Sequence, residues 1–170
     1  AGVVSIFGHD TFLQVADRPG GILLFLALSS TAVYGVMLAG WSSGSKYPLL
    51  GSVRATAQMV SYEAALGLSV ATVVLLTGSL STNAIVDAQA ATTSFFGFEV
   101  PSWNLWTAGV VPFVIFVLAG TAELNRPPFD LVEAEQELVG GFNTEYSSFR
   151  FALFFLAEFM NTITMSGVIV

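Results

Sequence analysis

The sequence contains no cysteine and only one histidine, and charged residues make up 10% of its 170 positions. Without cysteine, disulfides, thiolate metal sites and cysteine-ligated iron–sulfur clusters are excluded within this chain. His9 alone offers little to a haem or zinc site, and we interpret it as a residue of a surface loop. Residues 1–20 do not show the basic start and apolar core that are typical of a signal peptide.

Apolar residues, by contrast, make up 54% of the chain, and fifteen of them are phenylalanine. Because soluble domains carry roughly 25% charged residues, this composition indicates a membrane protein. A run at 151–170 contains only one charged residue, Glu158, and three further runs contain none: 22–41, 64–86 and 102–122. Each run is long enough for the ~20 residues that cross a bilayer as a helix.

These runs predict an all-α fold, a polytopic membrane bundle with four transmembrane helices. Helices are required because lipid offers the backbone no water, and runs so uniformly apolar do not fit the alternating strands of a barrel. The chain begins with Ala1 rather than methionine and ends inside an apolar run, so we interpret it as an interior fragment of a longer polypeptide. We expect a single membrane domain, 1–170, with spans at about 21–42, 57–80, 102–122 and 150–170.

Four of the five basic residues are predicted to lie on one side of the membrane. Lys46 and Arg54 lie between the first two spans, and Arg126 and Arg150 lie between the last two. By the positive-inside rule this side is the cytoplasm, or its organellar equivalent. Within the third span, Pro112 removes one backbone donor and is expected to bend the helix.

Two acidic residues, Glu63 and Glu158, fall inside the predicted spans. A charged side chain in lipid costs ~2.5–3.5 kcal/mol, so such acids usually face a bundle interior or a water-filled cavity. An interfacial glutamate that reaches out to water is the alternative. Near Glu158, Asn161 and Thr162 occupy the same helix face, which predicts a buried polar track.

The surroundings of Glu63 are apolar. Gly67 lies one turn further along and is expected to permit the close approach of another helix. Arg54 lies nine residues before Glu63, about 180° around a continuous helix. The two side chains therefore cannot pair along one face, and any partner of Glu63 must come from elsewhere.

The segment 122–147 contains six of the chain's twelve acidic residues, together with Arg126. Pro127 and Pro128 end one element, because proline fixes φ and lacks a backbone donor, and a new helix can begin there. We expect a short helix over 129–139, followed by two glycines that end it. One face of this helix carries three acids and the apolar face carries a fourth: Asp130, Glu133 and Glu137 on the first, Glu135 on the second.

Carboxylates crowded on one face, with another among apolar groups, favour proton uptake near neutral pH. A fully solvated acidic helix is the alternative interpretation. Arg126 and the corner formed by Pro127 and Pro128 argue against it, because a guanidinium beside acids normally organises them.

Three stretches of the sequence identify a family. "ELNRPPFDLVEAEQELVGGFNTEYS", the following "FALFFLAEF" and the earlier "AGWSSGSKYPLLGSVRATAQMVSYE" strongly resemble the quinone-site membrane subunit of respiratory complex I. Members of this family are the H subunit of bacterial NADH:quinone oxidoreductase and subunit 1 of the mitochondrial enzyme. The resemblance covers essentially the whole chain, which would correspond to the third to sixth of the family's eight helices. "NRPPFD" and "ELNR" depart from the common "NRAPFD" and "ETNR" only at non-ionisable positions.

The resemblance implies that the segment 123–148 lines the quinone cavity on the cytoplasmic side. Its cavity and coupling residues would be Glu123, Arg126, Asp130, Glu133, Glu135, Glu137, Phe142, Glu145 and Tyr146. It also implies a proton relay that includes Glu63, Glu158 and Arg54. The chain would bind no cofactor by itself. It would contain no metal site and no redox centre of its own.

The expected partners are the other membrane and peripheral-arm subunits of complex I, which would carry FMN and the iron–sulfur clusters. Quinone, as ubiquinone or menaquinone, would be the substrate, and no nucleic acid is expected. The chain would be a multi-pass protein of the cell inner (plasma) membrane, or of the mitochondrial inner membrane if organellar.

Two other functions fit part of the pattern. The homologous membrane subunit of a membrane-bound hydrogenase would share the helices and a related proline corner, although the intact "GFNTEYS" favours the quinone enzyme. A stand-alone proton or cation transporter would also place acids inside a bundle. It would usually show an inverted repeat and broken helices, and neither is visible in the sequence.

Overall fold

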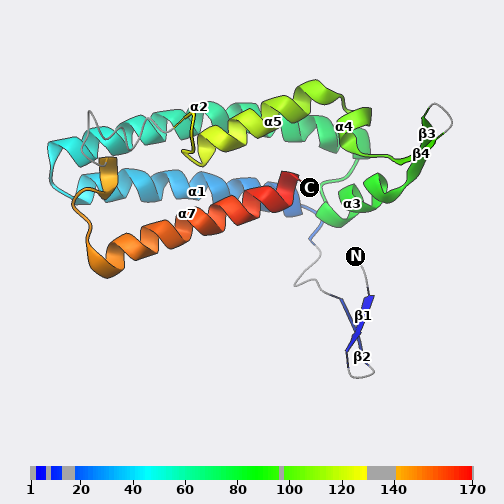
Figure 1. Ribbon diagram of the computed structural model, residues 1–170, viewed down its shortest axis with the longest axis horizontal. Coiled ribbons are helices and arrows are strands. Elements are labelled where there is room, and N and C mark those ends of the chain that lie inside the picture. Colours follow the sequence, from blue (N-terminus) through cyan, green and yellow to red (C-terminus); the bar gives the residue numbers. More distant parts are fainter. Residues whose placement is uncertain (1–2, 7–8, 13–17, 96–97, 130–140, 170) are drawn as a thin grey trace.

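The computed structural model describes residues 3–6, 9–12, 18–95, 98–129 and 141–169. Apolar helices run lengthwise and form the body of the molecule (Figure 1). They are α1 (Gly21–Ser42), α2 (Lys46–Thr77), α5 (Val110–Glu123) and α7 (Ser148–Ile169). Among the described residues, α1, α2 and α7 are long and apolar enough to cross a membrane, and α5 is a shorter apolar helix. The predicted all-α membrane bundle is confirmed.

Helix α2 has 32 residues and is therefore ~48 Å long, well beyond the ~30 Å of bilayer hydrocarbon. It begins at Lys46, eleven residues before the predicted span 57–80, so this helix includes the segment that contains Arg54. Pro48 lies in its first turn, where a missing N–H costs no helix hydrogen bond. The helix ends at Thr77 and is capped by Gly78, whose φ of 67° is the left-handed conformation that glycine adopts without strain.

The third predicted span is interrupted, but not where the sequence indicated. A single turn, α4 (Asn104–Thr107), is followed by Gly109 with φ of 95°, and α5 begins directly after it. Pro112 is the third residue of α5, where its missing N–H has no partner to lose. The prediction that Pro112 bends the span is therefore wrong, because the interruption depends on the positive φ of Gly109.

The end of the bundle away from the α1–α2 connection carries the short elements (Figure 1). Helix α3 (Thr82–Ala90) leads into an antiparallel hairpin of β3 (Thr92–Phe95) and β4 (Phe98–Pro101). A second antiparallel hairpin, β1 (Val3–Ile6) with β2 (His9–Phe12), lies near the N-terminus. His9 thus begins a strand and does not lie in a loop.

Helices α1 and α2 pack closely against each other at Gly40. A Cβ atom at Gly40 would overlap the Ser52 side chain and would lie 2.8 Å from the carbonyl oxygen of Pro48. At Gly67, where we expected a close helix contact, a Cβ atom would meet nothing within 4 Å. No helix among the described residues therefore approaches Gly67 closely, whereas the close packing of α1 against α2 depends on Gly40.

A core of buried apolar side chains joins all four helices, and Leu66 of α2 lies at its centre, fully buried. Met165 of α7 is also buried, and its sulfur would lie 3.5 Å from a Cβ atom at Gly120 of α5. Helix α7 therefore packs against α5 where that helix has no side chain. The remaining buried members of the core are Ile22, Val70, Phe116 and Ala119.

We predict that Gly40→Ala lowers the stability of the full-length protein in detergent by about 1–3 kcal/mol, because the added methyl group has no space between α1 and α2. Thermal unfolding checks this. Gly35→Ala in the same helix is the matched control, since a Cβ atom there meets nothing within 4 Å. Equal unfolding temperatures for the two variants would contradict the prediction.

Candidate functional site

The most buried acidic side chain that the structure describes is Glu123, the last residue of α5. It is only 3% exposed, and its Oε1 accepts a hydrogen bond from the hydroxyl of Ser29, a buried residue of α1. Its Oε2 is buried and has no hydrogen-bond partner among the described residues. One oxygen of this carboxylate is therefore bound to α1, while the other is enclosed without a donor from the described part of the chain.

A second carboxylate, Glu63 of α2, lies beside the first. It is half-buried, and its Oε1 accepts a hydrogen bond from the hydroxyl of Ser30, the neighbour of Ser29. Glu63 interacts electrostatically with Glu123. Three helices thus meet at a polar cluster inside an apolar bundle: two hydroxyls from α1, one carboxylate from α2 and one from α5. We refer to Ser29, Ser30, Glu63 and Glu123 as the carboxylate cluster.

The structure does not bring Arg54 into this cluster. Arg54 and Glu63 belong to the same continuous helix, and nine residues separate them by ~14 Å along its axis. The expectation that Glu63 takes its partner from another element agrees with the geometry, and the described partner is the Ser30 hydroxyl.

Glu158 of α7 pairs with Arg126, which follows α5. The guanidinium Nη2 lies 3.2 Å from Oε1 of Glu158, and the Arg126 guanidinium carbon lies 5.4 Å from the centre of the Phe159 ring. The two charged side chains are 39% and 31% exposed, so this ion pair is partly desolvated. Asn161 and Thr162 are also half-buried, in agreement with the predicted polar face of α7.

Gln58 of α2 holds the chain where it leaves α5. Its side-chain Nε2 donates to the carbonyl oxygens of Ala122 at 2.8 Å and Phe129 at 2.9 Å, and it lies 3.2 Å from Oδ1 of Asn125. One turn further along α2, Tyr62 packs edge-on against Phe129 with ring centres 5.3 Å apart. We call residues 122–129 the proline corner. Helix α2 therefore positions this corner through one amide and one aromatic ring.

Tyr146 lies in a different place. Its hydroxyl donates to the carbonyl oxygen of Ala39 at 2.8 Å and lies 2.7 Å from Oγ of Ser42, and its ring packs against Phe154 with centres 4.9 Å apart. It lines a cavity of about 550 Å³ between α1 and α7, together with Leu38 and Trp41. Because Ala39 is nine residues from Ser30 on α1, this cavity lies ~14 Å along the helix from the carboxylate cluster.

Of the remaining predicted site residues, Glu145 is exposed and lines a neighbouring cavity of about 630 Å³ with Arg150. Phe142 belongs to the short 3-10 turn η1 (Gly141–Asn143), but its side chain lies outside the described part of the structure. The predicted helix 129–139 lies outside the described residues from position 130 onward. The acids that it carries are Asp130, Glu133, Glu135 and Glu137.

Sequence reasoning missed Ser29, Ser30 and Gln58. The signal for the serines was present, because three consecutive hydroxyl side chains, Ser29, Ser30 and Thr31, interrupt an apolar run that has no charge. Gln58 precedes Glu63 by five residues and gave no comparable signal. Within the described ranges, no three His, Asp or Glu side chains come together in a way that would hold a metal ion.

Comparison with known proteins shows the family to which the chain belongs. A family model described as NADH dehydrogenase matches residues 2–170. The chain belongs to this family. It is 51% identical to the H subunit of the NADH-quinone oxidoreductase of Frankia alni over 97% of its own length, and 49% identical to that of Cutibacterium acnes over 98%. It is 55% identical to the corresponding protein of Leptospira biflexa over 91% of its length.

The chain spans only part of these curated relatives. It covers 34% of the Frankia alni protein, 38% of the Cutibacterium acnes protein and 41% of the Leptospira biflexa protein. The family is therefore shown over nearly all of this chain, while the relatives contain further segments that this chain does not match.

We predict that Gln58→Leu loosens the proline corner, because three acceptors lose their shared donor, at a cost of ~1–3 kcal/mol. Hydrogen exchange measured by mass spectrometry should become faster at the backbone amides of Arg126 and Phe129, which are both hydrogen-bonded in this corner. Ser61→Ala on the same helix is the control, since that exposed hydroxyl bonds only the helix backbone, to Ala57. Unchanged exchange in Gln58→Leu would show that the amide does not hold the corner.

Proposed function

We propose that the chain is part of the membrane subunit of a proton-translocating NADH:quinone oxidoreductase, which helps to form the quinone cavity and couples quinone reduction to proton movement. The observation that carries this proposal is the carboxylate cluster, where Glu63 and Glu123 are held by α1 hydroxyls inside an apolar bundle. Carboxylates in such surroundings interact strongly with nearby charge. The names of the curated relatives support the same enzyme.

In this proposal, electrons come from partner subunits that carry FMN and iron–sulfur clusters, and quinone is the substrate. The residues of this chain bind and move protons. Reduction of quinone near the segment 123–148 changes the charge at that segment, and the proton occupancy of the acids there changes in response. Asp130, Glu133, Glu135 and Glu137 of that segment are proposed cavity acids, together with Glu145.

The proline corner links that segment to the carboxylate cluster. Glu123 ends α5, and Arg126 lies three residues later and pairs with Glu158 on α7. Protonation of Glu158 would remove the negative partner of Arg126, and the field at Glu123 and Glu63 would change with it. We propose that charge changes pass between the segment and the cluster through this corner. Arg54, nine residues before Glu63 in α2, would contribute positive charge to the same path.

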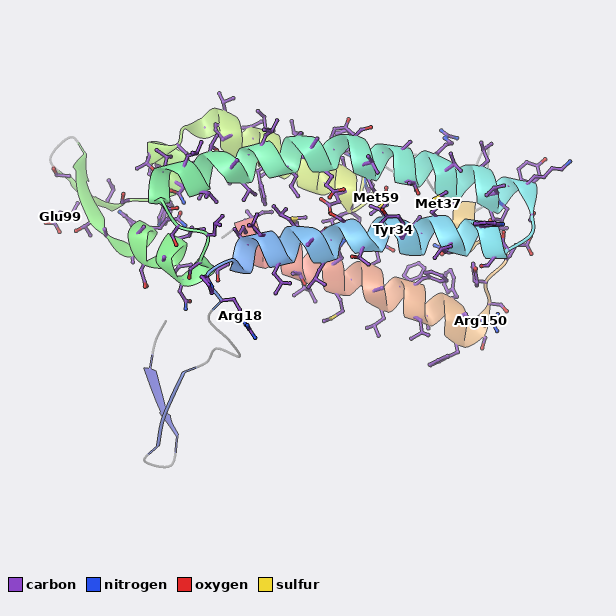
Figure 2. The ribbon with its side chains drawn as sticks, turned by 180° about the vertical axis from the view of Figure 1, so that it is seen from behind. Arg18, Tyr34, Met37, Met59, Glu99 and Arg150 are labelled. Carbon is purple, nitrogen blue, oxygen red and sulfur yellow. The ribbon has the colours of Figure 1, made fainter. Side chains whose placement is uncertain are left out.

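We further propose that the chain lies in the inner (plasma) membrane with the segment 123–148 on the cytoplasmic side. Lys46 begins α2 and Arg150 lies in the first turn of α7, so both mark the end of the bundle to which the segment returns. Arg18 and Glu99 lie at the opposite end (Figure 2). The excess of basic residues supports the cytoplasmic assignment of the first end.

The membrane subunit of a hydrogenase and a stand-alone transporter remain the competing functions. The relatives' names favour the quinone enzyme over both. Purification of the full-length protein with its partners separates the three. The proposal expects an iron–sulfur arm and inhibitor-sensitive quinone reductase activity. A nickel–iron hydrogenase in the complex, or ion flux through the lone subunit, would overturn it.

We predict that Glu63→Gln and Glu158→Gln each lower proton pumping or quinone-linked turnover of the assembled complex by roughly fivefold or more, the lower end of typical coupling effects. Glu135→Gln in the segment should do the same. Proton uptake and NADH oxidation in proteoliposomes measure the effect. Glu99→Gln is the control, because this acid is exposed at the opposite end of the bundle. Wild-type rates and stoichiometry in all three variants would sink the coupling proposal.

A further inference from the structure

Ser29 and Ser30 are adjacent on α1, yet each holds a different acid from a different helix. Neighbouring residues on a helix point about 100° apart, so this pair reaches α5 with one hydroxyl and α2 with the other. The two serines nevertheless have different surroundings. Ser29 is buried with Glu123, whereas Ser30 is half-buried and has a choice of acceptors.

That choice is between two oxygen atoms. The Ser30 hydroxyl is in position to donate to the carboxylate of Glu63 and to the backbone carbonyl of Leu26, at 3.0 Å, one turn earlier in α1. A serine hydroxyl has one proton to donate and two lone pairs to accept with. It can therefore donate to only one of these oxygens at a time, while its own oxygen stays available as an acceptor.

The two arrangements match the two protonation states of Glu63. An ionised carboxylate can only accept, so Ser30 then donates to Glu63. A protonated Glu63 has an O–H to donate, so it can donate to the Ser30 oxygen while the serine proton turns to Leu26. The serine gains and loses no proton in this exchange, and only the directions of the hydrogen bonds change.

We propose that Ser30 is a positioning residue for proton transfer at Glu63, because its hydroxyl holds this acid in one place, beside Glu123, in both charge states. This inference rests on the proposed function, since it specifies how one acid of the cluster is kept in position while its proton comes and goes. An acid without such a partner inside a bundle would leave a polar group unpaired in one of its two states.

The neighbouring residue Thr31 provides a matched control. Its hydroxyl also donates to a backbone carbonyl one turn earlier, that of Ala27 at 3.1 Å, but it is exposed and contacts no acid among the described residues. Thr31→Val therefore removes a similar hydroxyl from the same helix without touching the cluster. Ser30→Ala removes the proposed function of Ser30, and Ser30→Thr restores a hydroxyl at the same position.

The experiment measures quinone-dependent turnover and proton pumping of the purified, full-length complex with a short-chain quinone. We expect Ser30→Ala to lower kcat about tenfold with an unchanged KM for quinone, since a hydrogen bond to a charged group is worth on the order of a tenfold effect. Ser30→Thr should recover most of the wild-type kcat, and Thr31→Val should behave as wild type. A purely structural defect would not be reversed by the hydroxyl of threonine.

An infrared difference spectrum gives a second readout that does not depend on turnover. The carboxyl band that disappears in Glu63→Gln should shift in frequency in Ser30→Ala and stay in place in Thr31→Val. If Ser30→Ala does not assemble, Ser30→Cys, whose side chain has the same shape but is somewhat larger and donates weakly, should show the same losses.

The outcomes separate the two proposals. A wild-type complex without quinone reductase activity would overturn the proposed function. An active wild type, with kcat and the Glu63 band unchanged in Ser30→Ala or in Ser30→Cys, would overturn the inference and leave the proposed function intact. Loss of kcat in Ser30→Thr equal to that in Ser30→Ala would also overturn it, because the hydroxyl would then not be the group that matters.

Discussion

Each acid that enters this bundle needs hydrogen bonds from the protein itself, because apolar side chains and lipid provide none. Glu123 is 3% exposed and obtains its donor from Ser29 of α1. For the bond to form, α1 must lie against the helices that carry the acids, and its close packing on α2 depends on the missing side chain of Gly40. The hydrogen bonds of the cluster therefore depend on the helix packing. A bundle that separated α1 from α2 would also separate the hydroxyls from the carboxylates.

The position of the proline corner also depends on helix packing, because α2 contacts it. Gln58 and Glu63 lie on one helix, and Gln58 contacts the corner while Glu63 contacts the cluster. Helix α2 is continuous between them, so it holds the corner and the cluster at a fixed distance from each other. Glu123 ends α5 directly before the corner begins its turn. The segment that we propose as a cavity lining is thus connected to the buried acids by two routes, one through α2 and one through the chain itself.

Features that depend on the residues of one run could be predicted from the sequence, whereas features that depend on contacts between helices could not. The helices α1 and α7 followed from apolar runs with at most one charge, because hydrophobicity over twenty residues is a property of the run alone. The partners of Glu63 and Glu158 did not follow, since they depend on how three helices are rotated about their axes. Gly67 and Gly40 look alike in the sequence, yet only Gly40 faces a neighbouring helix closely. Pro112 was misjudged because its effect depends on the start of α5, which Gly109 sets.

The difference in length between α2 and α5 has a consequence for the membrane. Helix α5 has 14 residues, or ~21 Å, and after Glu123 the chain becomes polar while α2 continues beside it. A bilayer presents ~30 Å of hydrocarbon, which α5 alone is about a third too short to cross. Either the residues before α5 complete the crossing, or the polar proline corner lies at the depth of the hydrocarbon. In the second case, the part of the dielectric barrier that lies beyond a charge at the proline corner is shorter by about a third than a full span.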